Sequence, residues 1–265
     1  LLNLHLSPSE TMYGLLHMGE SHIALKKELK ELHPVFVSKS LYETMRSKYE
    51  FHRYSIIYNG VDFNYIDKAI NSKPKTRFYE AVVKAKERGY KVLIYPARLY
   101  PIKNHSTLIK ILRFLIKKYD PRILLVLTSD GISRQSIIRL AKKLGISENI
   151  IMTGKLPYDE TLRILNLADA VPYVSLYEST APLTLIEALY LNKFIVTFNF
   201  PYIKEISAFF SSLPIRLVNS VKGFIEELSS ISPNIASNNV RLPVKQFSID
   251  SMVNSYVRLY ERVYL

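Results

Sequence analysis

Short apolar runs alternate with amphipathic segments along most of the chain after residue 90. The runs have the length of buried strands, and the segments between them carry apolar residues at helical spacing. The expected strands cover 91–96, 123–129, 149–153, 170–175, 194–199 and 215–218, and the expected helices cover 105–119, 133–144, 158–168, 182–191, 202–210 and 220–230. This α/β alternation predicts a parallel sheet with helices on both faces, which binds ligands at the carboxyl ends of its strands.

The first part of the chain repeats the alternation on a smaller scale. Strands are expected at 1–6, 35–37 and 55–58, and helices at 21–32, 39–49, 76–88 and 248–264. Ser38 or Ser40 is the candidate N-cap of the helix at 39–49. Residues 62–75 contain Asn-Ser-Lys-Pro and are interpreted as a linker. Three short strands with two helices would make a thin sheet on their own.

The segment after the expected strand at 170–175 carries two carboxylates. Glu178 lies in the expected loop, Pro182 occupies the first helical position, and Glu187 lies in the second helical turn. A helix N-terminus offers free N–H groups to an anion, and carboxylates accept hydrogen bonds from hydroxyl groups. This combination fits the phosphates and hydroxyls of a nucleotide sugar. The alternative is an ordinary helix start with two solvated glutamates.

Two cations follow the expected strand at 91–96. Arg98 and Lys103 lie between this strand and the next helix, for which Asn104 is a candidate N-cap. Fixed cations beside a helix N-terminus suit a phosphate, and each charge-assisted hydrogen bond contributes about 1.5–3 kcal/mol. A pair of surface cations is the alternative, and the position at a strand end argues against it.

Composition excludes several classes of protein. The chain has 265 residues, of which 48% are hydrophobic, which is enough for one large globular domain or two small ones. It has no cysteine, which excludes disulfides and thiol catalysis. No membrane-spanning apolar run and no secretory leader are visible, so we expect a cytoplasmic protein. No convincing cluster of metal-ligating Cys, His, Asp or Glu side chains stands out, which agrees with our expectation of no bound metal and no other cofactor.

The net charge of +13 is unevenly distributed. Residues 1–68 hold eight basic and eight acidic residues, whereas 73–118 holds thirteen basic residues and two acidic ones. A basic field attracts phosphate-bearing ligands or anionic lipid, so we expect an acceptor that could be anionic or lipid-linked and a possible peripheral membrane contact. Nucleic acid is the rival partner, and the aromatic residues argue against it because most of them occupy apolar positions and are not interleaved with a basic surface. A solvated basic face is the default interpretation.

Several motifs occur in an order that resembles one enzyme family. They are Asn59-Gly60-Val61-Asp62, Ala97-Arg98-Leu99 with Lys103-Asn104, Met152-Thr153-Gly154-Lys155-Leu156-Pro157, Leu167-Ala168-Asp169-Ala170, and Leu176-Tyr177-Glu178 followed by Leu185-Ile186-Glu187-Ala188-Leu189. The chain is similar in these motifs to the retaining, nucleotide-sugar-dependent glycosyltransferases of the GT-B fold, known as glycosyl transferases group 1 (family 4). The resemblance covers roughly residues 35–265 and includes the last helix.

The resemblance implies a role for each matched position in binding a UDP- or GDP-sugar. The family transfers a hexose with retention of configuration at the anomeric carbon and needs no bound metal. The implied residues are Arg98, Lys103, Leu183 and Thr184 for the donor diphosphate, Glu187 for the ribose hydroxyls, Lys155 and Leu156 for the base, and Glu178 as a catalytic residue at the transferred sugar or diphosphate.

His5 is a second candidate catalytic residue. The segment Leu2-Asn3-Leu4-His5 resembles a strand of the family's N-terminal domain that ends in a histidine near the donor sugar. In that interpretation His5 hydrogen-bonds the sugar. The alternative is a surface histidine close to the start of the chain. The other histidines have no motif support and are interpreted as structural.

The sequence also departs from the family pattern. Eight residues separate Glu178 from Glu187, where the family usually has seven, and residues 179–181 replace a glycine-rich turn. Ala97 stands where glycine is usual, and residues 128–131 only partly match a glycine turn. Because the extra residue follows Glu178 directly, a changed geometry is expected there first.

The resemblance also implies a domain organisation. The family's N-terminal domain normally starts well before His5, and its first strands and glycine-rich phosphate loop have no counterpart in this sequence. We therefore expect a partial N-terminal, acceptor-side α/β domain over 1–68 and a Rossmann-like nucleotide-sugar-binding domain over 69–247. The helix at 248–265 is expected to pack back on the N-terminal domain. A trimmed fragment, a compact variant and a chain that borrows a partner's surface are each compatible with this pattern.

Two other functions stay open at this point. A catalytically reduced basic module could bind nucleic acid or an anionic membrane, and it would show salt-sensitive binding without turnover of nucleotide sugars. A sugar-nucleotide epimerase or a phosphorylase on the same fold is a third possibility, which product analysis would separate from the first.

Overall fold

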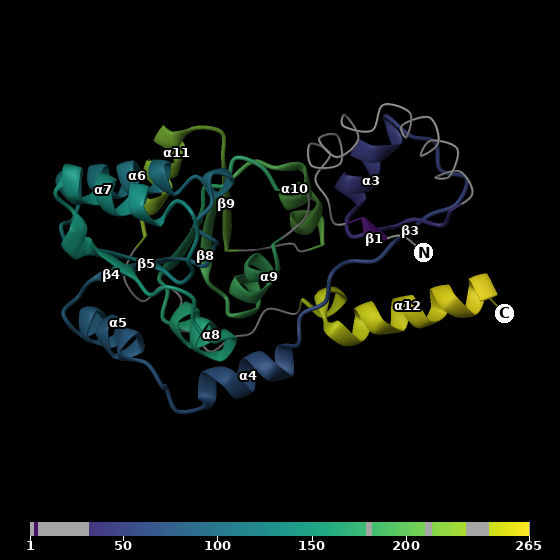
Figure 1. Ribbon diagram of the computed structural model, residues 1–265, viewed down its shortest axis with the longest axis horizontal. Helices are drawn as coiled ribbons and strands as arrows, with labels where there is room; N and C mark the ends of the chain where they lie inside the picture. Colours follow the sequence, from purple (N-terminus) through teal and green to yellow (C-terminus); the bar gives the residue numbers. More distant parts are fainter. Residues whose placement is uncertain (1–2, 5–31, 179–181, 210–213, 232–243, 265) are drawn as a thin grey trace.

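A computed structural model describes residues 3–4, 32–178, 182–209, 214–231 and 244–264 of the chain (Figure 1). Within them, a parallel sheet of six strands forms the larger part of the molecule. The strands are β4 (Lys91–Tyr95), β5 (Ile123–Leu127), β6 (Ile150–Met152), β7 (Ala170–Tyr173), β8 (Phe194–Phe198) and β9 (Ile215–Val218). Every residue of β4 and β5 is buried, as both faces of a central strand must be in such a sheet. The predicted α/β fold is confirmed.

Helices cover both faces of this sheet (Figure 1). One face carries α6 (His105–Lys118), α7 (Arg134–Leu144) and α11 (Val221–Ser229), and the other carries α5 (Arg77–Glu87), α8 (Tyr158–Asn166) and α9 (Leu183–Tyr190), with α4 (Phe63–Asn71) packed on α8 and α9. The helix α10 (Pro201–Ala208) connects β8 to β9. Apart from α4, which was not predicted, these bounds lie within two residues of the predicted ones, because apolar periodicity and helix-ending residues such as Gly145 are local signals.

The order of the strands creates a ligand-binding position. The sheet runs β6-β5-β4-β7-β8-β9, so the chain first builds outward from β4 in one direction and then returns to build from β7 in the other. The strands β4 and β7 are neighbours, paired at Leu93 and Ala170. The loops that leave their carboxyl ends go to opposite faces, which opens a crevice between them. We call this position the switch point.

A glycine fixes the loop after β5 against the loop after β4. A Cβ atom added at Gly131 would lie 2.5 Å from the carbonyl oxygen of Leu99, so only glycine allows this approach. Two backbone hydrogen bonds complete the contact, from Leu99 N to Asp130 O at 3.0 Å and from Ser133 N to Leu99 O at 2.8 Å. The segment that carries Arg98 is therefore held by a neighbouring strand's loop.

The predicted linker at 62–75 is wrong over most of its length, because α4 occupies Phe63–Asn71. The side chain of Asp62 caps this helix by accepting a hydrogen bond from Tyr65 N at 2.8 Å. Ile66 and Ala69 are buried against α8 and α9. Asp62 as an N-cap, followed by apolar residues at helical spacing, indicates this helix in the sequence. The turn residues around Pro74 favoured a linker instead.

The N-terminal part forms a second, smaller parallel sheet, ordered β1-β2-β3 in the described residues. Its elements are β1 (Asn3–Leu4), β2 (Val35–Phe36), α3 (Lys39–Arg46) and β3 (Ser55–Ile56). Ser38 is the N-cap of α3, since its hydroxyl accepts a hydrogen bond from Leu41 N at 3.0 Å. The helix expected at 21–32 lies outside the described residues except for its last position.

The final helix α12 (Ile249–Tyr264) lies beside this small sheet (Figure 1). Its Leu259 is buried together with Val35 and Ile57. The chain before it, which includes the short helix η3 (Lys245–Phe247), passes close to Gly60, where a Cβ atom would lie 2.6 Å from the Cα of Ile249. The domain boundaries at residues 68 and 247 remain a prediction.

Candidate functional site

The two segments that leave the switch point are tied to each other. After β4 the chain forms the short helix η1 (Pro101–Lys103), and after β7 it passes through Leu176. The backbone N–H of Leu176 donates a hydrogen bond of 2.9 Å to the carbonyl oxygen of Ile102. The segment of Lys103 and the segment of Glu178 are thus brought together, although the residues are 75 positions apart in sequence.

Lys103 and Glu178 form an ion pair, with Lys103 Nζ bonded to Glu178 Oε1. Both side chains are largely shielded from solvent. The same oxygen accepts a hydrogen bond of 2.6 Å from the Ser175 hydroxyl, which lies 3.0 Å from the buried Tyr95 hydroxyl. Tyr95 also donates to the carbonyl oxygen of Lys103 at 3.0 Å. Sequence reasoning missed Tyr95 and Ser175, although a hydroxyl at the end of a buried strand needs a partner.

Arg98 differs from Lys103 in its surroundings. Its side chain is exposed, and its guanidinium lies over the ring of Tyr100 at 5.2 Å. No ion pair joins it to a carboxylate among the described residues. Its five N–H donors are therefore open to an anion at the switch point.

Asn104 does not cap α6 in the expected way. The turn of η1 leaves Asn104 in the left-handed region, with φ of 55°, and its side-chain oxygen accepts a hydrogen bond from the Thr107 hydroxyl at 2.8 Å. No side-chain hydrogen bond to the α6 backbone is made. Asparagine tolerates this backbone conformation better than most residues, which explains its place after η1.

The N-terminus of α9 points toward the same edge of the sheet. Pro182 is its N-cap residue and Leu183 its first helical residue, so the amides of Leu183 and Thr184 have no acceptor within the helix. The Thr184 hydroxyl lies 2.9 Å from the Tyr173 hydroxyl, which donates to it. Leu183 is exposed, and residues 179–181 lie outside the described residues.

Glu187 is buried in α9, with only 3% of its surface exposed. Its Oε1 accepts a hydrogen bond of 2.8 Å from the Tyr158 hydroxyl, and its Oε2 has no hydrogen-bond partner in the described part of the chain. Burial raises the pKa of Glu187, and the hydrogen bond from Tyr158 lowers it. Tyr158 was not predicted, although it follows directly on the motif that ends at Pro157.

The predicted base-binding residues lie at the end of β6. Gly154 adopts the left-handed conformation with φ of 73°, and it turns the chain toward α8. Lys155 is exposed and Leu156 is half-buried against the main core. They precede Tyr158 on the same edge of the sheet. His5, the remaining predicted site residue, lies outside the described residues.

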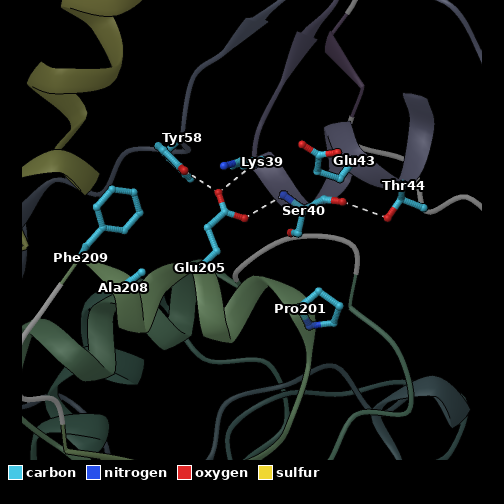
Figure 2. Close-up of a pocket in the computed structure, with 9 residues that line it drawn as sticks. All are labelled: Lys39, Ser40, Glu43, Thr44, Tyr58, Pro201, Glu205, Ala208 and Phe209. Carbon is cyan, nitrogen blue, oxygen red and sulfur yellow. Dashed lines mark hydrogen bonds between the residues drawn. The ribbon is translucent and has the colours of Figure 1, made fainter. Parts of the chain in front are cut away.

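A second polar contact joins α10, which follows β8, to α3, which follows β2 (Figure 2). The carboxylate of Glu205, in α10, accepts hydrogen bonds from Lys39 N at 2.7 Å and from Ser40 N at 2.8 Å, which are the first amides of α3. The Tyr58 hydroxyl also donates a hydrogen bond to Glu205. The pKa of Tyr58 is raised, mainly by burial. A cavity of about 590 Å³ lies beside this contact, between α3 and α10.

The cations of 73–118 do not gather on one surface. Helices α5 and α6 cover opposite faces of the sheet (Figure 1). The exposed Lys84 belongs to α5, whereas the exposed Lys110 and Lys117 belong to α6. Lys86 is bound to the buried Asp169 at 2.6 Å and has a structural role. This distribution disfavours a continuous nucleic-acid or membrane surface built from this segment.

Two searches of the described residues gave negative results. No group of three or more His, Cys, Asp or Glu side chains is placed to hold a metal ion. None of the described helices has the length and apolar character needed to cross a lipid bilayer.

The strand order defines a doubly wound α/β protein, and sheets of this kind bind ligands at the switch point. Residues 79–210 match the family described as Glycosyl transferases group 1, and the chain therefore carries a domain of that family, as its motifs predicted. A search of curated proteins found no match.

Solved structures share the fold over nearly the whole chain. HepE from Anabaena, crystallised with UDP, has a TM-score of 0.71 at 16% identity, with 98% of this chain and 71% of that one covered. A glycosyltransferase from Rickettsia africae has a TM-score of 0.67 at 18% identity, with 90% and 66% covered. Sucrose-phosphate synthase from Thermosynechococcus elongatus has a TM-score of 0.69 at 15% identity, with 91% and 61% covered. The chain thus spans about 60–70% of the length of these proteins.

Proposed function

We propose that this chain is a glycosyltransferase, which moves a hexose from a nucleoside-diphosphate sugar to an acceptor with retention at the anomeric carbon and without a bound metal. Its family domain supports the reaction class. HepE from Anabaena, which shares the fold, was crystallised with UDP-glucose, which supports a donor of this kind. The observation that carries the proposal is the convergence of cations, a helix N-terminus and a buried carboxylate at the switch point.

Arg98 and Lys103 are proposed to hold the donor diphosphate. Arg98 offers a planar fork of donors, and Lys103 is already held at the switch point by Glu178. The amides of Leu183 and Thr184 add donors from the N-terminus of α9. When the bond from the sugar to the diphosphate breaks, the leaving diphosphate takes the electron pair, and these groups stabilise its charge.

Glu187 is proposed to bind the ribose. A carboxylate accepts hydrogen bonds only, and its Oε2 has no partner among the described residues. Ribose hydroxyls would supply donors to this oxygen. Lys155 and Leu156 follow β6 on the same edge, and we propose that they flank the base.

Glu178 and His5 remain the proposed catalytic residues. Glu178 lies beside Lys103, so it would contact the sugar or the diphosphate at the reacting bond. The acceptor is proposed to be anionic or lipid-linked, with the enzyme in contact with a membrane surface. The division of the cations between two faces gives it little support. Retention would be tested by determining the anomeric configuration of the product by NMR.

Calorimetric titration with UDP, GDP and their hexose derivatives tests the donor site. The double variant Arg98→Ala/Lys103→Ala should weaken nucleotide affinity by about 30-fold or more, because two charged contacts to phosphate are lost. The matched control is Lys110→Ala/Lys117→Ala, which removes two exposed cations of α6 that lie outside the site. Equal affinity of the double variant and the wild type would show that the site assignment is wrong.

A further inference from the structure

We propose that Tyr158 is the positioning residue for Glu187 in nucleotide binding: its hydroxyl occupies one carboxylate oxygen and directs the other to the ribose hydroxyls. This inference rests on the proposed function, since it concerns the same donor site. It assigns a role to a residue outside the motifs from which the site was predicted.

The contact divides the two oxygens of Glu187. Oε1 receives the Tyr158 hydroxyl at 2.8 Å, whereas Oε2 is buried with no hydrogen-bond partner in the described residues. A buried carboxylate oxygen without a donor is costly, so proteins rarely retain one without a use for it. A ligand hydroxyl that reaches Oε2 would satisfy this oxygen. Because Tyr158 already fixes Oε1, the carboxylate cannot rotate freely to meet the ligand in another way.

Tyr158 is itself held by α4. Its ring stacks on Tyr65 with centroids 5.5 Å apart and an interplanar angle of 12°. Tyr158 as a whole is 47% exposed, whereas its hydroxyl is hydrogen-bonded to the buried Glu187. A ring with one stacked face and a bonded hydroxyl has little freedom to rotate. The hydroxyl is therefore placed before a ligand binds, as a positioning residue requires.

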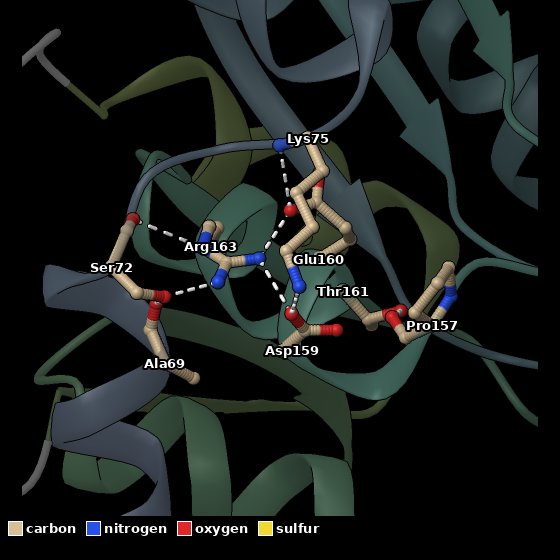
Figure 3. A network of polar contacts seen from close by, with 8 residues as sticks. All are labelled: Ala69, Ser72, Lys75, Pro157, Asp159, Glu160, Thr161 and Arg163. Carbon is tan, nitrogen blue, oxygen red and sulfur yellow. Dashed lines mark hydrogen bonds and ion pairs between the residues drawn. The ribbon is translucent and has the colours of Figure 1, made fainter.

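A buried ionic network fixes α8 relative to α4 (Figure 3). Arg163, which is 3% exposed, donates to the carbonyl oxygen of Ser72 at 3.2 Å and to Asp159 at 2.9 Å, and it also contacts Glu160 and the Ser72 hydroxyl. The Lys75 amide donates to Glu160 at 3.1 Å. The network joins the segment after α4 to the first two turns of α8. It thereby sets the distance between Tyr65 and Tyr158.

The hydroxyl also acts on the charge of Glu187. Burial raises the pKa of Glu187, and the hydrogen bond from Tyr158 opposes this. The other titratable groups near the pair are Tyr173 of β7, Tyr65 of α4 and Asp62 at the start of α4, none of which is a cation. Removing the hydroxyl therefore leaves burial unopposed and raises the pKa of Glu187 further. The ionised form that accepts ribose hydroxyls is then lost at a higher pH.

The test compares wild type, Tyr158→Phe and the control Tyr119→Phe, which removes a hydroxyl from an equally exposed tyrosine at the end of α6. Each protein is titrated with UDP, 2′-deoxy-UDP, GDP and 2′-deoxy-GDP between pH 5 and 8. For Tyr158→Phe we expect about tenfold weaker binding of the ribonucleotide and a smaller loss of affinity for the 2′-deoxy nucleotide. The acid limb, which is the fall in nucleotide affinity at low pH as Glu187 is protonated, should move to higher pH. Tyr119→Phe should match the wild type, and Glu187→Gln should remove the limb.

The outcomes separate the two proposals. If the wild type binds a nucleotide but Tyr158→Phe keeps its affinity, its preference for ribose and its acid limb, the role of Tyr158 is overturned and the proposed function stands. If the wild type binds neither nucleotide, the proposed function fails, and the positioning role fails with it. A carbon-13 NMR titration of the Glu187 carboxyl tests the contact without any nucleotide. An unchanged titration midpoint in Tyr158→Phe would overturn the inference by itself.

Discussion

At the scale of single residues, the charged groups of the switch point are already arranged around one another. Lys103 is held by Glu178, and Glu178 is held in turn by the Ser175 hydroxyl. A diphosphate that binds here would add to this pair or compete with Glu178 for Lys103, whereas Arg98 has no such competitor among the described carboxylates. The two cations are therefore expected to contribute unequally to nucleotide binding.

His105 is a residue whose burial makes stability depend on pH. Only 2% of its surface is exposed, and its ring packs against Tyr95 with centroids 5.0 Å apart. Burial, which disfavours the charged form, lowers the pKa of His105 from 6.5 to about 4. Between these two values the unfolded chain binds a proton and the folded chain does not. The stability associated with neutral His105 is therefore complete above pH 6.5 and is lost as the pH falls toward 4.

We predict that His105 lowers the free energy of unfolding of the wild type by about 2 kcal/mol when the pH is lowered from 7.5 to 5. In His105→Phe, which keeps an aromatic ring beside Tyr95, that part of the pH dependence should disappear. Urea denaturation at the two pH values measures it. His52→Phe is the control, because His52 is exposed. An equal pH dependence in His105→Phe and in the wild type would contradict the assignment.

At the scale of elements, α3 obtains its N-terminal cap from two sources. Ser38 satisfies one amide from within the same segment, and Glu205 of α10 satisfies the amides of Lys39 and Ser40 from the other sheet (Figure 2). A carboxylate at a helix N-terminus also interacts favourably with the helix dipole. The start of α3 thus depends on a contact between the two parts of the molecule.

Glu205→Ala is predicted to lower the free energy of unfolding by about 1–2 kcal/mol, because the charged cap and its hydrogen bonds are lost. Hydrogen exchange of the Lys39 and Ser40 amides should become faster. Glu43→Ala is the matched control, since Glu43 lines the same cavity and its ion pair with Arg46, at 3.4 Å, is exposed to solvent. It should change stability by less than about 0.5 kcal/mol. Unchanged exchange in Glu205→Ala would contradict the role of Glu205.

The elements themselves were largely predictable from the sequence. β4 and β5 are short apolar runs, and α7 ends at Gly145. Hydrophobic periodicity and helix-ending residues were therefore sufficient to predict these elements. The exception was α4, where Asp62 was not recognised as a cap. The positions of Arg98, Lys103 and Glu187 on one edge followed from the alternation of strands and helices, although their roles remain proposals.

The contacts between elements could not be predicted in the same way. Tyr158 and Glu187 are 29 positions apart, Tyr95 and Ser175 are 80 apart, and Lys39 and Glu205 are 166 apart. A local pattern shows that a residue is polar or buried, but it does not show its partner. The pair of Tyr95 and Ser175 depends on the pairing of β4 with β7, and the pair of Lys39 and Glu205 depends on the packing of α3 against α10.

At the scale of the whole molecule, the parts that carry the two sheets are in contact through one helix from each. The helix α3 follows β2 and α10 follows β8, and the two helices are in contact through Glu205 (Figure 2). The carboxyl end of the larger sheet, after which α10 begins, also carries the switch point.

The proposed function is the transfer of a hexose from a nucleoside-diphosphate sugar. Its most direct test is the release of UDP or GDP from the corresponding hexose donors by the purified protein, followed in a coupled assay. We expect slow release of the nucleotide from at least one donor with water as acceptor. This release should be lost in Arg98→Ala/Lys103→Ala and retained in Lys110→Ala/Lys117→Ala. No release from any donor, together with salt-sensitive binding to RNA or anionic vesicles, would contradict it.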